Sequence, residues 1–191
     1  MEPTTVQSLH TIYVRQRITL MINRYEVWAG DAAGNLQSMI GFAEQKRMTL
    51  REQVTLYTDD TKSHVLAAFK ARSIVDLGAT YDVVDGAGAP IGLFRKDFAA
   101  SLLRSTWHLE QPGLPSAVGR ERNQLVAILR RFTDLSFLPY HFDFIANGAL
   151  VMSVDKKWAL RDTYAVTINN PQLDRRLAVA MAVALDALQA R

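Results

Sequence analysis

The sequence predicts a mainly β protein in which a sheet curls around one apolar C-terminal helix. The segment from Leu177 to Leu188 reads LAVAMAVALDAL, and Asp186 is its only polar residue. A helix that is apolar on every side must be buried on every side. Most of the chain before it reads as short strands with alternating hydrophobicity. A lone apolar helix at the end of a strand-rich chain therefore predicts a sheet around it.

The C-terminal segment could also be a strand, because alanine recurs at every second position from 178 to 184 and strands have a period of two. Alanine favours helices and is depleted in strands, so we interpret the segment as a helix. Asn170 is its expected cap and Pro171 its expected first residue. Burial of its six larger apolar side chains contributes on the order of 10–15 kcal/mol gross, which rivals the net stability of a domain. We therefore expect the helix to organise the fold.

Three turn signals separate the predicted strands. Tyr25–Trp28 leads into GDAAGN over 30–35, and Tyr81–Val84 leads into DGAG over 85–88. Neither cluster has the spacing of a phosphate-binding loop, so we interpret both as turns. Asn147-Gly148 lies between two alternating segments and predicts a hairpin.

The remaining elements follow from hydrophobic periodicity. Helical spacing predicts short helices over 98–103 and 124–132, and the segment 111–119, QPGLPSAVG, is expected to be a loop. No linker divides the chain, so we predict one domain over 1–191, with 1–10 as a loosely attached N-terminal segment. Further strands are predicted over 12–17, 18–22, 37–45, 54–58, 64–71, 91–96, 105–110, 141–146, 149–154 and 164–168.

Composition excludes several classes of protein. The chain has 49% hydrophobic and 21% charged residues, which is ordinary globular usage. A net charge of +3 is far below the charge density of a dedicated nucleic-acid binder. Cysteine is absent, which excludes disulfides, thiolate metal sites and cysteine nucleophiles. No secretory signal is visible, and the longest uncharged apolar run, nine residues, is too short for a bilayer. We expect a cytoplasmic protein that associates with a membrane only peripherally.

The order of these features resembles a known family. Strands with Tyr-acid-Val before Gly-rich turns are followed by Ile91-Gly92, Arg95-Lys96, Trp107, a segment 148–158 with Lys156-Lys157, the strand 164–168 and the apolar helix carrying Asp186. Over about residues 10–190 this order is similar to the LURP-one-related and phospholipid-scramblase-like proteins, relatives of the tubby C-terminal domain.

The resemblance implies a closed antiparallel barrel of about twelve strands around a central C-terminal helix. Closure removes exposed sheet edges, and the helix fills a lumen too wide for side chains alone. The resemblance also implies membrane-associated roles, since tubby domains bind phosphoinositide headgroups and scramblases are linked to lipid movement and calcium. The chain lacks the cysteine-rich palmitoylated segment of animal scramblases, so we do not expect scramblase activity.

Catalytic and metal-binding patterns are absent from the sequence. The four histidines lack H-x-x-x-H and H-E-x-x-H spacing, and no serine lies in G-x-S-x-G. His141 and Asp143 share one strand face and could bind a metal or form an acid–base pair, but an outward polar face is the simpler interpretation. Asp59-Asp60 and Asp85 lack the EF-hand spacing and are expected to cap turns. We predict no catalytic residue, no metal and no cofactor.

Pairs of basic residues are the most suggestive feature. Several pairs on one barrel face would bind phosphates of lipid headgroups or of nucleic acid, whereas a solvated surface is the simpler alternative. Neighbours on a strand point to opposite faces, so each pair contributes one residue to any patch. The pairs are Lys46-Arg47, Arg95-Lys96, Arg130-Arg131, Lys156-Lys157 and Arg175-Arg176.

The charged residues at the two ends of the predicted helix lead to two further predictions. Arginines at its start oppose the helix dipole and need acidic partners or solvent, and Asp174 is one such partner for the pair Arg175-Arg176. Asp186 is also unfavourable at its end of the helix, so we expect it at the barrel rim, paired with a cation.

We therefore predict a non-enzymatic binding or scaffold module that recognises anionic, phosphoinositide-type headgroups at a membrane surface. Arg95, Lys96, Lys156 and Lys157 are the expected contacts. One alternative is a regulatory protein–protein interaction domain without a lipid ligand. A second is a nucleic-acid-binding protein, for which Lys157 beside Trp158 offers one basic–aromatic neighbour.

Overall fold

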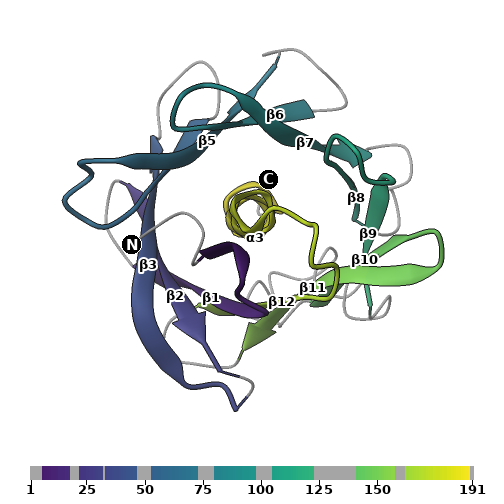
Figure 1. Cartoon of the computed structure of the whole chain (residues 1–191), viewed down its shortest axis with the longest axis horizontal. Coiled ribbons are helices and arrows are strands. Elements are labelled where there is room, and N and C mark those ends of the chain that lie inside the picture. Colours follow the sequence, from purple (N-terminus) through teal and green to yellow (C-terminus); the bar gives the residue numbers. More distant parts are fainter. Residues whose placement is uncertain are drawn as a thin grey trace, which may run out of the picture.

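The strands form one closed antiparallel barrel around helix α3 (Figure 1). The computed structural model describes residues 6–17, 22–31, 33–46, 53–72, 80–97, 105–122, 141–157 and 162–189. Each strand pairs with its neighbours in sequence, and β1 closes the barrel by pairing with β12. The strands in these ranges are β1 (Thr11–Arg17), β2 (Asn23–Gly30), β3 (Leu36–Lys46), β4 (Gln53–Tyr57), β5 (Val65–Ala71), β6 (Thr80–Asp85), β7 (Pro90–Asp97), β8 (Thr106–Glu110), β9 (Ala117–Glu121), β10 (His141–Ala146), β11 (Ala149–Lys157) and β12 (Thr163–Ile168).

Helix α3 (Arg175–Gln189) runs through the middle of the barrel. Every side chain from Leu177 to Leu185 is at most 3% exposed, as an apolar helix enclosed by a sheet requires. Alternate side chains of each strand point inward, so Phe142 and Phe144 are buried while Ile145 is exposed. The predicted architecture, a barrel around a C-terminal helix, is confirmed.

The two ends of the barrel differ, and we name them by the helix. The mouth is the end at which α3 begins, where the turns 31–35, 58–64, 86–89, 111–116 and 147–148 connect the strands. The base is the end at which α3 finishes, beside the starts of β2 and β12. The connections between strands at the base lie outside the described residues.

The turns at the mouth agree with the turn interpretation. Asp31 accepts hydrogen bonds from the backbone and side chain of Asn35, each at 2.9 Å. Asp85 accepts from the backbone nitrogens of Ala87 and Ala89 at 2.9 and 2.8 Å. Asn147 and Gly148 both have positive φ, 49° and 79°, as a two-residue hairpin turn requires.

Strand β9 corrects the prediction of a loop over 111–119, because Ala117–Glu121 is a strand. Its sequence, AVGRE, has few of the β-branched and aromatic residues that mark strands, so local pattern could not reveal it. Gly119 is required by packing, since a Cβ atom there would lie 2.3 Å from a ring carbon of Phe144. Contact with the neighbouring strand β10, rather than the intrinsic strand propensity of its residues, places β9.

The helix begins later than predicted, at Arg175. Asn170 caps a turn instead, where its Oδ1 accepts the backbone N–H of Gln172 at 2.9 Å. Asp174 is the helix cap, since its Oδ1 accepts the backbone N–H of Arg176 at 2.8 Å. Two capping residues lie close together in the sequence, and the first is used by the turn.

The N-terminal segment is fastened to the start of the helix from Val6 onward, which differs from the loose attachment expected for 1–10. Val6 is buried in the core. Gln7 donates from Nε2 to Asp174 Oδ1 at 2.9 Å and accepts the backbone N–H of Arg175 at 3.1 Å. Residues 1–5, the predicted helices 98–103 and 124–132, and 18–21 of the predicted strand 18–22 lie outside the described residues.

Candidate functional site

The four basic residues predicted as headgroup contacts all lie near the base, at the ends of β7 and β11. Lys96 points inward, with Nζ 5.7 Å from the ring centre of the buried Trp107. Lys156 also points inward, is 8% exposed and donates from Nζ to Asp162 at 2.9 Å. Arg95 and Lys157 are the outward members of their pairs, because side chains alternate along a strand.

The two outward candidates do not converge on one ligand. Strands β8, β9 and β10 lie between β7 and β11 in the barrel wall. Neighbouring strands are about 4.8 Å apart, so Arg95 and Lys157 are separated by about 19 Å along the sheet. Arg95 also approaches Glu110, with 3.6 Å between Nε and Oε1. The structure thus brings the four residues to one end of the barrel but not into one pocket.

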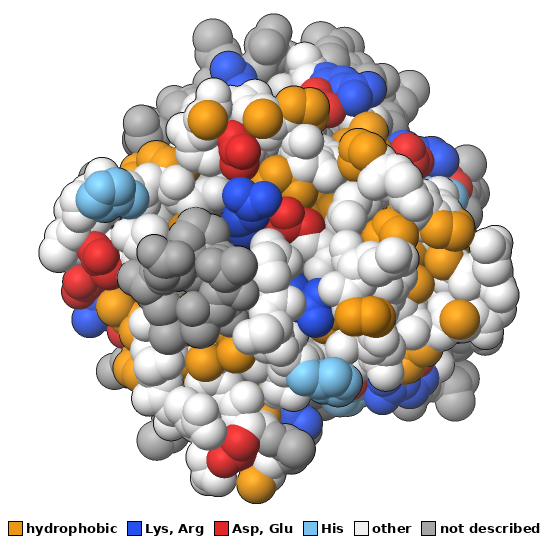
Figure 2. Space-filling view, in the orientation of Figure 1, with side chains coloured by type: hydrophobic (Ala, Val, Ile, Leu, Met, Phe, Trp, Pro, Cys, Tyr) orange, Lys and Arg blue, Asp and Glu red, His pale blue; other side chains and the backbone are white. Residues whose placement is uncertain are grey.

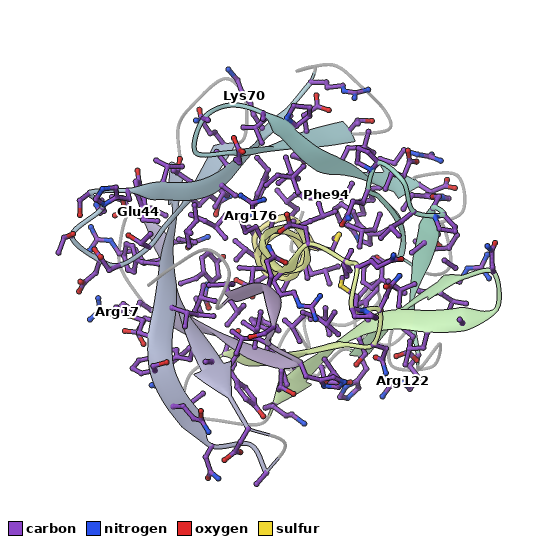
Figure 3. The ribbon with its side chains drawn as sticks, in the orientation of Figure 1. Arg17, Glu44, Lys70, Phe94, Arg122 and Arg176 are labelled. Atoms are coloured by element: carbon purple, nitrogen blue, oxygen red, sulfur yellow. The ribbon has the colours of Figure 1, made fainter. Side chains whose placement is uncertain are left out.

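Charge is distributed unevenly between the two ends. Lys70 and Arg122 point away from the barrel, whereas Phe94 points toward α3 (Figure 3). Several base cations are paired with acids, as Arg17 is with Glu26 at 2.9 Å. The mouth turns carry acidic residues, Asp31, Asp59, Asp60 and Asp85, with few outward cations. Acidic residues also lie among the base cations, where they form ion pairs: Glu26, Glu44, Asp82, Asp143 and Asp155. By strand direction, the outward basic side chains described near the base are Arg15, Arg17, Arg24, Lys70, Arg72, Arg95, Arg120, Arg122 and Lys157.

His141 and Asp143 belong to an ion-pair network on the outer face of β10 and β11. Arg122 donates to both oxygens of Asp143, at 2.8 and 2.5 Å, and its Nη1 lies 3.3 Å from Asp155 Oδ1. His141 Nδ1 lies 2.8 Å from the same Asp155 oxygen. The hydrogen bonds to Asp143 are the main reason that the pKa of Arg122 is raised. In the described part of the chain, no group of three or more potential ligands is arranged to hold a metal ion.

Asp186 lies inside the base rather than paired with a cation at the rim. Tyr25 donates its hydroxyl to Asp186 Oδ2 at 2.7 Å, and Tyr164 donates to Oδ1. Burial raises the pKa of Asp186, while these two hydroxyls and the nearby Lys156 act in the opposite direction. Both tyrosines occupy inward positions of strands that flank β1, and this long-range placement could not be deduced from the helix sequence.

The two arginines at the helix start have different partners. Arg176 pairs with Asp174, with Nη2 and Oδ2 2.7 Å apart, as the sequence predicted. Arg175 is 4% exposed, and burial lowers its pKa. Its guanidinium donates to backbone carbonyl oxygens of Leu9, Asn170, Pro171 and Leu173.

A pocket at the mouth is the feature that sequence reasoning missed. It has a volume of about 290 Å³ and is lined by the β8–β9 turn, the β10–β11 turn and the segment before α3. Its walls are mainly apolar, with Leu109, Leu114, Leu150 and Leu173 among them. Hydrophobic side chains gather over these turns in the view onto the mouth (Figure 2). Two turns and the segment before α3, which are far apart in sequence, build the pocket, so no local motif predicts it.

Comparison with protein families identifies the family of this chain. A model of the LURP-one-related family matches residues 39–186, most of the barrel and α3. No curated protein matches the chain. Among the described residues, no helix has the length and apolar character needed to span a bilayer. The matched region covers well over half of the chain, so the protein belongs to the LURP-one-related family.

Proposed function

We propose that this protein is a non-enzymatic binding module, in which the barrel is a rigid scaffold and ligands bind to its outside. The observation that carries this proposal is the filled lumen. A barrel of this size often holds a ligand inside, but here α3 occupies the axis with side chains that are at most 3% exposed from Leu177 to Leu185. Binding must then use the outer wall or the two ends.

For the ligand of the base, we propose anionic phospholipid headgroups at a membrane surface. Arg95 and Lys157, which face outward near the base, are the proposed contacts. A membrane is a charged plane, and each nearby lysine or arginine gains about 1 kcal/mol separately, so the cations need not converge into one pocket. The inward Lys96 and Lys156 act in this proposal by supporting the base rather than by touching lipid, because each lies against an aromatic ring inside the barrel.

Vesicle flotation tests the lipid proposal. The full chain is mixed with phosphatidylcholine vesicles, with or without phosphatidylserine and a phosphoinositide, at low and moderate salt. Flotation only with anionic vesicles, weakened by salt, is expected because the attraction is electrostatic. The double variant Arg95→Gln/Lys157→Gln should lose most of this binding, whereas Ala87→Asp/Leu150→Asp, which changes the net charge by the same amount at two exposed positions of the mouth, should retain it.

The outcomes separate the alternatives. Absence of flotation with anionic vesicles at low salt would overturn the lipid proposal and leave the scaffold proposal standing. Equal losses in the base and mouth variants would show that net charge, not the base, governs binding. A gel shift with duplex and single-stranded DNA tests the nucleic-acid alternative, for which we expect no retained complex.

A further inference from the structure

We propose that two copies of this chain associate through the outer wall of the barrel formed by β9, β10 and β11. On this face an exposed apolar row lies next to charges of both signs, and a two-fold axis along β10 would relate the two copies. The proposal concerns contact between protein molecules in solution, so it stands independently of the lipid proposal.

Three apolar side chains form a row across these strands at the mouth end of the wall. Val118 on β9 pairs with Ile145 on β10, and Ile145 pairs with Leu150 on β11. Directly paired residues lie on the same face of a sheet, with Cβ atoms about 4.5–5.5 Å apart, so the row is continuous. Ile145 is 46% exposed and Leu150 is 41% exposed. Isolated exposed apolar residues are ordinary, but a row of them favours an interaction surface.

The next two rows of this face, toward the base, carry charges of both signs. Arg120 pairs in register with Asp143, and Arg122 forms ion pairs with both Asp143 and Asp155. Arg122 points away from the barrel (Figure 3), as a residue of the outer wall does. The formal charges of these two arginines and two aspartates cancel, so a second copy meets no net repulsion. An apolar centre with a polar edge is the usual anatomy of a protein interface.

Arg120 is the member of this group that has no partner within its own chain. It is exposed, and it forms no ion pair with the residues that the structure describes. Its cross-strand neighbour Asp143 is bound through both carboxylate oxygens by Arg122. Asp155 uses Oδ1 for Arg122, and its Oδ2 has Ser153 Oγ at 3.4 Å. Because a carboxylate offers about four acceptor sites, Asp155 can accept a further arginine from outside the chain.

A two-fold axis along β10 packs the apolar row against its own copy. Strands β9 and β11 flank β10 on opposite sides. Such an axis therefore places Ile145 against the same residue of the second copy, and Val118 against the partner's Leu150. All three members of the row are covered by this single arrangement.

The charged rows match in the same arrangement. Arg120 and Arg122 face the partner's Asp155, because the axis sets β9 of one copy against β11 of the other. Asp143 lies close to the axis, where Arg122 of its own chain neutralises it. A strongly basic or strongly acidic partner would instead meet like charges on half of the face. The face complements itself in apolar contact and in charge, which identifies a second copy as its occupant.

The size of the face predicts a weak dimer. The face spans three rows of residues on three strands, and neighbouring strands are about 4.8 Å apart. Its area is therefore well below the roughly 800 Å² that each partner contributes to a standard interface. Association should be reversible and should depend on protein concentration, so a measurement that captures transient dimers is needed.

Cysteine cross-linking of the full chain tests the proposal, because the chain has no cysteine of its own. His141→Cys places a thiol on β10 beside the axis and leaves the apolar row intact. Thr55→Cys on β4, across the barrel, is the matched control, and both positions are half-buried. A short bismaleimide is added over a range of protein concentrations. We expect His141→Cys to form covalent dimers at least tenfold faster than Thr55→Cys, at a rate that rises with concentration.

Three further substitutions, each made in the His141→Cys chain, locate the contact. Ile145→Asp and Arg120→Asp should each slow cross-linking at least tenfold, whereas Lys70→Asp, an equal charge reversal on β5, should leave it unchanged. Ile145, Arg120 and Lys70 are exposed, so all three variants should fold, and circular dichroism checks this. Equal cross-linking rates of His141→Cys and Thr55→Cys would overturn the proposal. A rate unchanged by Ile145→Asp or Arg120→Asp, or lowered equally by Lys70→Asp, would overturn it too.

Discussion

Asp186 places a carboxyl group inside the barrel, where Tyr25 and Tyr164 donate their hydroxyls to it. Burial is the largest influence and raises its pKa. Compared with the unfolded chain, the folded protein therefore favours the protonated carboxyl group of Asp186. The contribution of Asp186 to stability is fully present below its unfolded pKa and is lost as pH rises through its folded pKa.

We predict that Asp186→Asn stabilises the protein at pH 7 more than at pH 4. The amide oxygen can still accept a hydroxyl, and the variant no longer buries a charge at high pH. Thermal unfolding of both proteins across pH 4–7 measures the effect. A difference in melting temperature that stays constant with pH would show that ionisation of Asp186 does not affect stability.

Gly119 gives a second prediction at the scale of one residue. Gly119→Ala should destabilise the fold by about 1–3 kcal/mol, because the new methyl group collides with the Phe144 ring. Phe144→Leu in the same chain should recover part of this loss, and urea unfolding of the double-mutant cycle measures the coupling. Strictly additive effects would indicate that the ring is not the obstacle.

Single residues could be predicted only where a local rule applies. Strand periodicity predicted that each basic pair would contribute one outward residue, as Arg95 and Lys157 do while Lys96 and Lys156 point inward. The separation of β7 from β11 depends on the strand order of the whole barrel. Likewise, the partners of Asp186 come from positions 161 and 22 residues away in sequence.

Elements were predictable where their signal was strong and local. The all-apolar helix and the Asn147-Gly148 hairpin needed no long-range information, and both are confirmed. The start of α3 was placed too early because Asn170 and Asp174 both have capping side chains. Strand β9 was missed because its residues suit their place only through contact with β8 and β10.

The helix as an element carries the stability of the fold, so a charge in its middle should abolish folding. Met181 is fully buried, and Met181→Asp would leave an unpaired carboxylate at the centre of the barrel. The cost, several kcal/mol, is comparable to the roughly 5–15 kcal/mol that stabilises a whole domain. Far-UV circular dichroism and thermal melting measure the loss. The exposed control Gln172→Asp should melt like the parent, and unchanged melting of Met181→Asp would refute an enclosed helix.

At the scale of the whole molecule, the barrel is a scaffold with two unlike ends. The outward cations described in its wall gather toward the base, and the mouth combines acidic turns, exposed apolar side chains and a neutral pocket. Because α3 fills the axis, these ends are separated by a solid core. The proposed arrangement therefore places the base on an anionic membrane and turns the mouth away from it.

The orientation of the barrel on a membrane tests this account most directly. The chain has no cysteine, so Thr163→Cys, beside Lys157 in the β11–β12 pair, and Leu150→Cys each provide one labelling position, at the base and at the mouth. An environment-sensitive fluorophore is attached to each variant, and vesicles containing phosphatidylserine and a phosphoinositide are added. The account predicts that the label at position 163 responds to the vesicles and the label at 150 does not. A response at 150 without one at 163 would contradict it.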